Sequence, residues 1–204
     1  MNWMKKVAVA LVCLLPLGLQ AAKIDTLQVK SPSMNKSIEV VVVSPDVAAT
    51  KACPVIYLLH GYGGNACTWV GIKPDLPKIA DEKGIFFVCP DGKNTWYWDS
   101  PLNADVRYET FISNELVKYV DSHYKTVADR KGRAITGLSM GGHGAMWNGL
   151  RHSDVFSAAG STSGGVDIRP FPKNWEMSVQ IGEKAKYPEN WEKYTVINLV
   201  PTLR

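Results

Sequence analysis

A Gly-x-Ser-x-Gly sequence, Gly137 to Gly141, is the feature of this chain that points most directly to chemistry. A serine hydroxyl can act as a nucleophile when a tight turn lifts it away from the backbone and a base removes its proton. The apolar run Ala134–Gly137 precedes this turn, and a helix-compatible run, residues 142–150, follows it. Glycines permit so tight a strand-to-helix turn. The pattern predicts that Ser139 is a nucleophile at a helix N-terminus, where developing negative charge is stabilised.

A glycine-rich loop, His60 to Gly64, follows directly on the apolar run Val55–Leu59. Acyl transfer through a serine needs two backbone N–H groups that bind the negative oxygen of the tetrahedral intermediate. In enzymes with this kind of turn, one comes from the residue after the nucleophile, here Met140, and the other from a loop after an earlier strand. Taken alone, the loop is also compatible with an ordinary turn at a strand end. Together with the serine motif it predicts Tyr62 and Met140 as the oxyanion donors.

The elements that must position these residues alternate along the chain. Apolar and β-branched runs predict strands, and apolar residues spaced by three and four predict helices. Strands are expected at 23–29, 38–43, 55–59, 85–88, 134–137 and 156–160, and helices at 75–83, at 107–124 and from just after 139 to about 151. Strands that alternate with helices indicate an α/β fold, a mostly parallel sheet with helices on both faces. Without repeats or low-complexity linkers, residues 23–204 form one expected domain, whose proline- and tryptophan-containing tail from Asp167 is expected to cap a site.

The first 22 residues have the three-part pattern of a secretory signal peptide. A basic start, Met1–Lys6, precedes an apolar run, Val7–Leu19, and small residues for cleavage, Ala21 and Ala22. The apolar run is too short to span a membrane, and no small residue precedes Cys13 as a lipoprotein anchor would need. The alternative, an amphipathic core helix, lacks a polar face. The protein is therefore expected to be secreted or periplasmic, without a membrane anchor.

Composition and cysteine spacing exclude several classes of function. The hydrophobic fraction of 46% and charged fraction of 21% are globular values. The formal charge is only +4 and no run of Lys or Arg exceeds a pair, so nucleic acid is not an expected partner. Outside the signal, Cys53, Cys67 and Cys89 form no Cys-x-x-Cys pair, so no zinc site or other metal is expected. These three allow at most one disulfide, and buried free thiols are expected at Cys53 and Cys89.

Several segments together resemble a known family, the esterase D group of α/β-hydrolases. They are His60–Gly64, Pro90–Gly92 with Trp96–Ser100, Tyr108–Phe111 and Ala134–Ala145. The group includes S-formylglutathione hydrolases, tributyrin and feruloyl esterases, and mycolyltransferases, and the resemblance spans about residues 55–165. It implies that Ser139 is the nucleophile and that Tyr62 and Met140 form the oxyanion hole. It also implies that Trp96 and Asp99 lie near the mouth of the site, as substrate-binding residues.

The rest of the catalytic machinery is not found at matching positions. In the family that the chain resembles, the triad acid and histidine follow the nucleophile, on loops after the seventh and eighth strands. Six strands are expected here, so the resemblance implies a C-terminally incomplete domain whose acid and base lie beyond Arg204. None of the four histidines fits the base position. All four are expected to be structural, with His60 bracing the oxyanion loop; the others are His123, His143 and His152.

The sequence therefore predicts a secreted serine carboxylic-ester hydrolase that works through an acyl-enzyme and needs no cofactor. The expected partner is a small-molecule ester, or an acetyl or feruloyl ester linked to a polysaccharide. Rings of the substrate would stack on tryptophans, unless these pack under the cap: Trp96, Trp98, Trp175 and Trp191. Acyl transfer of the mycolyltransferase type is a variant of the same chemistry. The alternative from another class is a non-catalytic or truncated relative that binds carbohydrate or lipid.

Overall fold

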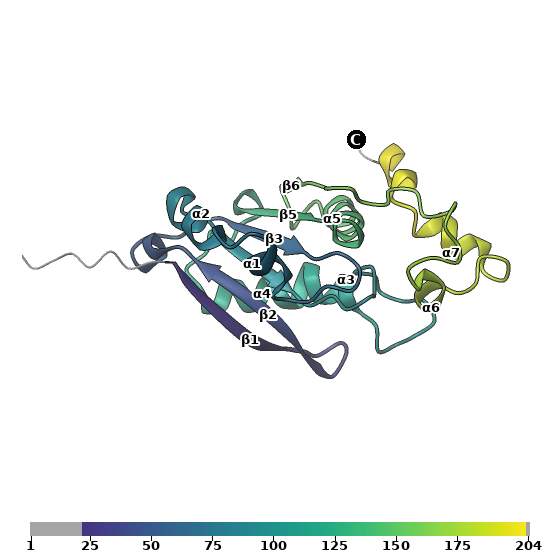
Figure 1. The fold of residues 1–204 in the computed structure, drawn as a ribbon, viewed down its shortest axis with the longest axis horizontal. Coiled ribbons are helices and arrows are strands. Elements are labelled where there is room, and N and C mark those ends of the chain that lie inside the picture. The colour runs from purple at the N-terminus through teal and green to yellow at the C-terminus, as the bar shows by residue number, and fades with distance from the viewer. Residues whose placement is uncertain (1–21, 203–204) are drawn as a thin grey trace, which may run out of the picture.

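The computed structural model describes residues 22–202, which are built around one sheet of six strands (Figure 1). Its order is β1-β2-β4-β3-β5-β6. The strands are β1 (Lys23–Ser31), β2 (Lys36–Ser44), β3 (Val55–Leu59), β4 (Phe86–Pro90), β5 (Arg133–Gly137) and β6 (Ala158–Ala159). Strand β2 pairs antiparallel with β1 and β4, and the three remaining pairs are parallel. The predicted α/β fold with a mostly parallel sheet is confirmed.

Helices cover both faces of this sheet. They are α1 (Thr68–Ile72), α2 (Leu76–Lys83), α3 (Tyr108–Thr110), α4 (Leu116–His123), α5 (Met140–Arg151), α6 (Met177–Ile181) and α7 (Pro188–Lys193). A π-helical segment, Phe111–Glu115, joins α3 to α4, and three 3-10 segments are Asp46–Ala49, Arg130–Gly132 and Val196–Thr202. The helix predicted at 107–124 is confirmed as the unit α3–π–α4. The end predicted for α2 is also confirmed, because Gly84 takes the left-handed conformation with φ 64°.

Alternation along β2 explains how one strand contributes to two cores. Val40 and Val42 join the cluster that contains side chains of α3–π–α4 and α5, whereas Val41 and Val43 join the cluster that contains side chains of α2. Successive side chains of a strand point to opposite faces, so these two clusters lie on opposite sides of the sheet. Both β3 and β4 are almost wholly buried, as the uninterrupted apolar runs predict for parallel strands covered on both faces.

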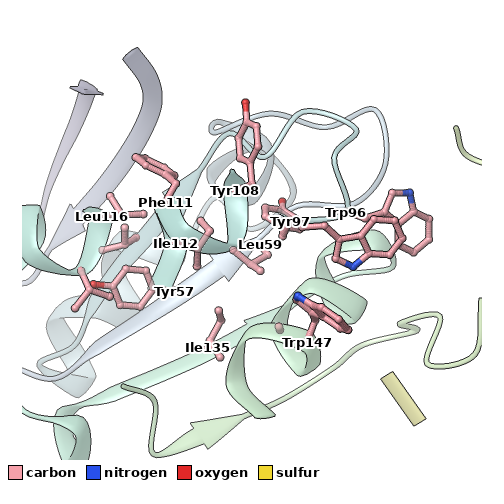
Figure 2. Close-up of a cluster of buried hydrophobic side chains, with 14 of the residues drawn as sticks. Tyr57, Leu59, Trp96, Tyr97, Tyr108, Phe111, Ile112, Leu116, Ile135 and Trp147 are labelled. Carbon is pink, nitrogen blue, oxygen red and sulfur yellow. The ribbon is translucent and has the colours of Figure 1, made fainter. Parts of the chain in front are cut away.

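Figure 2 shows the larger of the two cores, between the sheet and the helices. Tyr57 and Leu59 on β3 meet side chains of the π-helical segment and α4, such as Ile112 and Leu116. Trp147 of α5 is 1% exposed and closes the same core next to the aromatic loop 96–98. Rings of this size each bury a large apolar area, so α5 and the loop before α3 are fixed against the sheet.

The tail from Asp167 contains no strand among its described residues, as predicted, but it does contain two short helices that were not predicted, α6 and α7. Trp191 anchors α7, because its buried indole donates to the Gly182 carbonyl at 2.9 Å. The tail lies at the end of the molecule nearest the start of α5 (Figure 1).

Three expectations concern features away from the site. The predicted signal, residues 1–22, lies outside the described residues except for Ala22. Between residues 22 and 202, no helix is long and apolar enough to cross a membrane. Within the same range all three cysteines are free, with Cys53 and Cys89 buried and Cys67 exposed.

Candidate active site

Ser139 is the second of the two residues, Leu138 and Ser139, that connect β5 to α5. Its backbone has φ 55° and ψ −116°, a sparsely populated conformation that costs a non-glycine residue roughly 1–3 kcal/mol. The neighbouring positions must be glycine because a larger side chain would clash with the backbone. A Cβ on Gly137 would lie 2.3 Å from the Gly141 oxygen, and one on Gly141 would lie 2.1 Å from the Leu59 oxygen. The side chain of Ser139 remains exposed. The turn therefore presents an accessible hydroxyl at the N-terminus of α5.

Two backbone N–H groups beside Ser139 have no hydrogen-bond partner among residues 22–202: those of Tyr62 and Met140. Met140 is the first residue of α5, so its N–H has no partner within the helix. The loop that carries Tyr62 runs very close to the serine, since a Cβ on Gly61 would lie 3.5 Å from the Ser139 Cβ. The structure thus brings together the three residues that the sequence predicted for nucleophile and oxyanion hole.

His60 holds the peptide that precedes Tyr62. Its Nδ1–H donates to the Gly61 carbonyl at 2.7 Å, and its Nε2 accepts from the Gly92 N–H at 2.9 Å, which assigns the proton to Nδ1. The C=O and N–H of a trans peptide point in opposite directions. Fixing the Gly61 carbonyl therefore fixes the direction of the Tyr62 N–H. This is the bracing geometry expected of His60, which is 1% exposed.

A pocket of about 280 Å³ opens beside Ser139. Its walls are mostly aromatic and apolar, and come from the oxyanion loop, the loop before α3, the loop after β6 and the tail: Tyr62, Trp96, Ser163, Gly165, Asp167, Ile168, Phe171, Trp175 and Met177. The rings of Phe171 and Trp175 lie 5.5 Å apart, and Trp175 lies 6.4 Å from Trp96. Desolvation, together with a hydrogen bond to Glu176, raises the pKa of the Tyr62 phenol at the rim. The tail does form one wall of a site, as the cap prediction required.

Of the two predicted substrate-binding residues, Trp96 lines the pocket and Asp99 does not. The carboxylate of Asp99 instead accepts from the N–H and the hydroxyl of Thr110, at 3.0 and 2.6 Å, and so holds the start of α3. Among the tryptophans proposed for stacking, Trp98 and Trp191 are fully buried, whereas Trp175 is 45% exposed. Only Trp96 and Trp175 are placed to contact a ligand.

The remaining histidines all have partners other than Ser139 within the described chain. His143 is buried between the Trp98 indole, which donates to Nε2 at 2.9 Å, and the Gly165 carbonyl, which accepts from Nδ1 at 2.7 Å. Burial lowers the pKa of His143 to about 4, against a weaker opposing effect of the Gly165 bond. His152 contacts Glu109 at 2.8 Å, and His123 contacts the Tyr119 carbonyl at 2.8 Å. No described histidine is thus hydrogen-bonded to the serine.

Other residues of the site were not singled out by the sequence. Asn94 accepts from the Gly63 N–H at 2.9 Å, and its position just after Pro90–Gly92 was the only available signal. Ile168, Phe171 and Met177 lie in the tail and carry no motif. In residues 22–202 no cluster of three or more His, Cys, Asp or Glu side chains is arranged to hold a metal ion.

Comparison with known proteins gives relatives that are esterases by name. The chain is 28% identical over 149 residues to an esterase of Mycobacterium tuberculosis (strain CDC 1551 / Oshkosh), covering 70% of this chain and 32% of that protein. It is 32% identical over 102 residues to the acetyl esterase of Caldicellulosiruptor saccharolyticus, covering 50% of this chain and 37% of that protein. The chain therefore spans about a third of the length of these curated relatives.

Solved structures give the same picture of the fold. A ferulic acid esterase superimposes with a TM-score of 0.66 at 30% identity, covering 86% of this chain and 71% of that one. An S-formylglutathione hydrolase from Agrobacterium tumefaciens gives 0.75 at 22% identity, with 90% and 72% covered, and supports the α/β-hydrolase fold alone. Finally, the family model Esterase, described as "Putative esterase", matches residues 31–203. With nearly all of the described fold inside that match, the chain belongs to this esterase family.

Proposed function

We propose that this chain carries the nucleophile and oxyanion hole of a serine carboxylic-ester hydrolase. The observation that carries the proposal is the placement of an exposed, strained Ser139 beside the unpartnered N–H groups of Tyr62 and Met140. A backbone N–H without a protein partner is free to donate to an acceptor that a ligand supplies. The negative oxygen of a tetrahedral intermediate is such an acceptor.

In the proposed reaction, Ser139 Oγ bonds to the ester carbonyl carbon and a general base takes the hydroxyl proton. The carbonyl oxygen becomes an oxyanion bound by Tyr62 N–H and Met140 N–H. Collapse of this intermediate expels the alcohol, which receives the proton, and leaves an acyl group on the serine. Water then repeats the sequence and releases the acid. The base is not one of the four described histidines, because the structure gives each of them another partner or an exposed site away from the serine.

The aromatic pocket supports a planar or small acyl group as substrate. Trp96, Phe171 and Trp175 offer ring faces and edges within a volume of about 280 Å³, and offset or edge contacts between rings are favourable. We propose acetyl or feruloyl esters, free or linked to polysaccharide, in keeping with relatives named acetyl esterase and ferulic acid esterase. The N-terminal pattern of residues 1–22 supports a secreted or periplasmic location.

A second candidate is a non-catalytic relative that binds carbohydrate or lipid in the same pocket. It is favoured by one observation, the lack of a described histidine bonded to Ser139. The pocket, the exposed Trp175 and the exposed Phe171 would serve binding equally well. Acyl transfer to an alcohol, as in mycolyltransferases, would use the same acyl-enzyme and differ only in the acceptor.

Ser139→Ala tests the proposal, with Ser153→Ala as a matched control because Ser153 is exposed and uses only its backbone carbonyl, toward Arg130. We expect a fluorophosphonate to label the wild-type chain and the control but not Ser139→Ala, since phosphonylation needs the nucleophile. Hydrolysis of short acyl esters should be lost with the label. Equal labelling of Ser139→Ala would refute the nucleophile. An unlabelled wild type that still binds glycans or lipid would favour the second candidate.

A further inference from the structure

We propose that Asn94 is a positioning residue that ties the oxyanion loop to the aromatic wall of the pocket. It bonds to both at once, through Gly63 on one side and Glu176 on the other. The inference rests on the proposed esterase function, because its effect is on the oxyanion hole.

Asn94 and Trp96 make three of the hydrogen bonds that join the loop at 92–97 to the two neighbouring segments. Asn94 Oδ1 accepts from the Gly63 N–H at 2.9 Å, one residue after the donor Tyr62. Asn94 Nδ2 donates to Glu176 Oε2 at 3.3 Å. The Trp96 indole donates to the Trp175 carbonyl at 3.1 Å. The loop therefore stands between the oxyanion loop and the residues that form the pocket wall.

The chemistry at Asn94 requires an amide. One end of the side chain must accept from a backbone N–H, and the other must donate to a carboxylate. An aspartate in its place would keep the first bond but set two carboxylates against each other. Alanine would lose both. Such a two-ended contact transmits a displacement of Trp175–Glu176 to Gly63, and so to the adjacent Tyr62 N–H.

Backbone strain is concentrated at the same contact. Trp96 and Tyr97 have φ values of 58° and 60°, and Trp175 and Glu176 have φ values of 50° and 53°. Non-glycine residues hold this conformation only when surrounding contacts fix it. Two strained pairs lie against each other here, held by the Trp96–Trp175 and Asn94–Glu176 bonds. A substrate that fills the pocket would contact Trp175 and so displace these two strained pairs. Asn94 would pass that displacement to Gly63 and change the rate of turnover.

The test compares N94A, N94D and the double variant N94D/E176Q with the wild type. Asn114→Ala serves as control, because Asn114 is exposed on the π-helical segment. The readouts are the second-order rate of fluorophosphonate labelling of Ser139, and kcat and KM for p-nitrophenyl acetate. In the double variant the introduced amide at 176 can donate to the introduced carboxylate at 94, which still accepts from the Gly63 N–H, so both contacts are restored, with donor and acceptor exchanged in the contact between 94 and 176.

We expect N94A and N94D to lower the labelling rate and kcat by about three- to tenfold, as for loss of one positioning bond, with KM within twofold of wild type. The double variant and Asn114→Ala should stay within twofold on both readouts. If Asn94 had a purely structural role, N94A and N94D would shift the unfolding midpoint, and the double variant would not restore the labelling rate and kcat. Labelling of N94A at the wild-type rate, or no rescue in the double variant, would overturn the inference alone. An unlabelled wild-type chain would overturn the proposed function and the inference with it.

Discussion

At the scale of single residues, the site depends on backbone groups more than on side chains. Tyr62 and Met140 are predicted to act through their N–H groups, so their side chains matter little to the oxyanion. Nearby residues direct those groups: His60 fixes the peptide before Tyr62, and the strained turn at Ser139 fixes Met140. Substitutions that remove an N–H and substitutions that remove a side chain should therefore have different effects.

Tyr62→Pro removes the N–H and is expected to lower kcat on a short acyl ester by about a hundredfold or more, the usual effect of losing an oxyanion donor. Because the Tyr62 N–H has no partner in the described chain, the fold loses no backbone hydrogen bond, and the contact of the phenol with Glu176 is lost equally in the alanine control. Tyr62→Ala is the matched control, since it keeps the N–H and loses only the ring. A folded Tyr62→Pro protein within tenfold of Tyr62→Ala would place the donor elsewhere.

The lowered pKa of His143 makes us expect the free energy of unfolding to depend on pH. Its pKa is lowered by burial from 6.5 to about 4 in the folded protein, so between these values the unfolded chain binds more protons and stability falls as the pH falls. The expected loss from pH 6.5 to pH 4 is roughly 3 kcal/mol. Urea unfolding measured at several pH values should show this slope, and His143→Asn should flatten it. An equal slope in the variant would mean that other groups are responsible.

At the scale of elements, the strand-to-helix turn between β5 and α5 tolerates almost no added volume. The turn packs against the end of β3, where the Leu59 carbonyl faces Gly141. Backbone cannot move aside as a flexible side chain can, so a methyl group at this position must displace either β3 or α5. Either displacement would also move Ser139 relative to Tyr62.

Gly141→Ala is accordingly expected to destabilise the protein by about 1–3 kcal/mol, through overpacking, and to lower its melting temperature by several degrees. Gly71→Ala is the control, because a Cβ at that helical position in α1 meets nothing within 4 Å. Calorimetry should show the control unchanged or slightly stabilised. A Gly141→Ala protein as stable as Gly71→Ala would contradict the packing described here.

Elements with a clear sequence pattern, a continuous apolar run or a helical period, were predictable from the sequence, and the short helices of the tail were not. The runs at 55–59 and 134–137 are apolar because both faces of β3 and β5 are covered, so their composition identifies them. The helices α6 and α7 have five and six residues, too few for a period, and depend on tertiary contacts such as Trp191 to Gly182. The same holds for the candidate site: motifs predicted Ser139 and Tyr62, whereas only the fold brings Phe171 to the pocket and Asn94 to the neighbouring Gly63.

At the scale of the whole molecule, no described histidine is hydrogen-bonded to Ser139, the proposed nucleophile. One of these histidines, His152, belongs to a buried cluster around Glu109, whose carboxylate accepts from Trp147, Arg151 and His152 at 2.8 Å each. Burial opposes ionisation of Glu109, but these bonds hold its pKa below the usual value. The polar groups around Glu109 therefore stabilise the packing of α3 against α5.

Turnover by the 1–204 chain is expected to be weak. Without a triad base, the oxyanion hole and binding still give about 10³–10⁴-fold acceleration over water, far below an ordinary esterase rate of about ten per second. Steady-state hydrolysis of p-nitrophenyl acetate by purified monomer measures this. A rate near ten per second would mean that one of His60, His123, His143 or His152 is the base. Alanine substitution of each in turn would identify it.

The strand order has a consequence for synthesis of the chain. The β1–β2 hairpin can close as soon as residue 44 is made, but β3 pairs only with β4 and β5, which begin at residues 86 and 133. At roughly 5–20 residues per second, the segment Val-Ile-Tyr-Leu-Leu of β3 waits for several seconds before both neighbours exist. During that interval a strand destined for the centre of the sheet has two open edges, which favours pairing with other chains. A holding chaperone that covers residues 55–59 would therefore raise the yield of folded protein more than one that covers the hairpin.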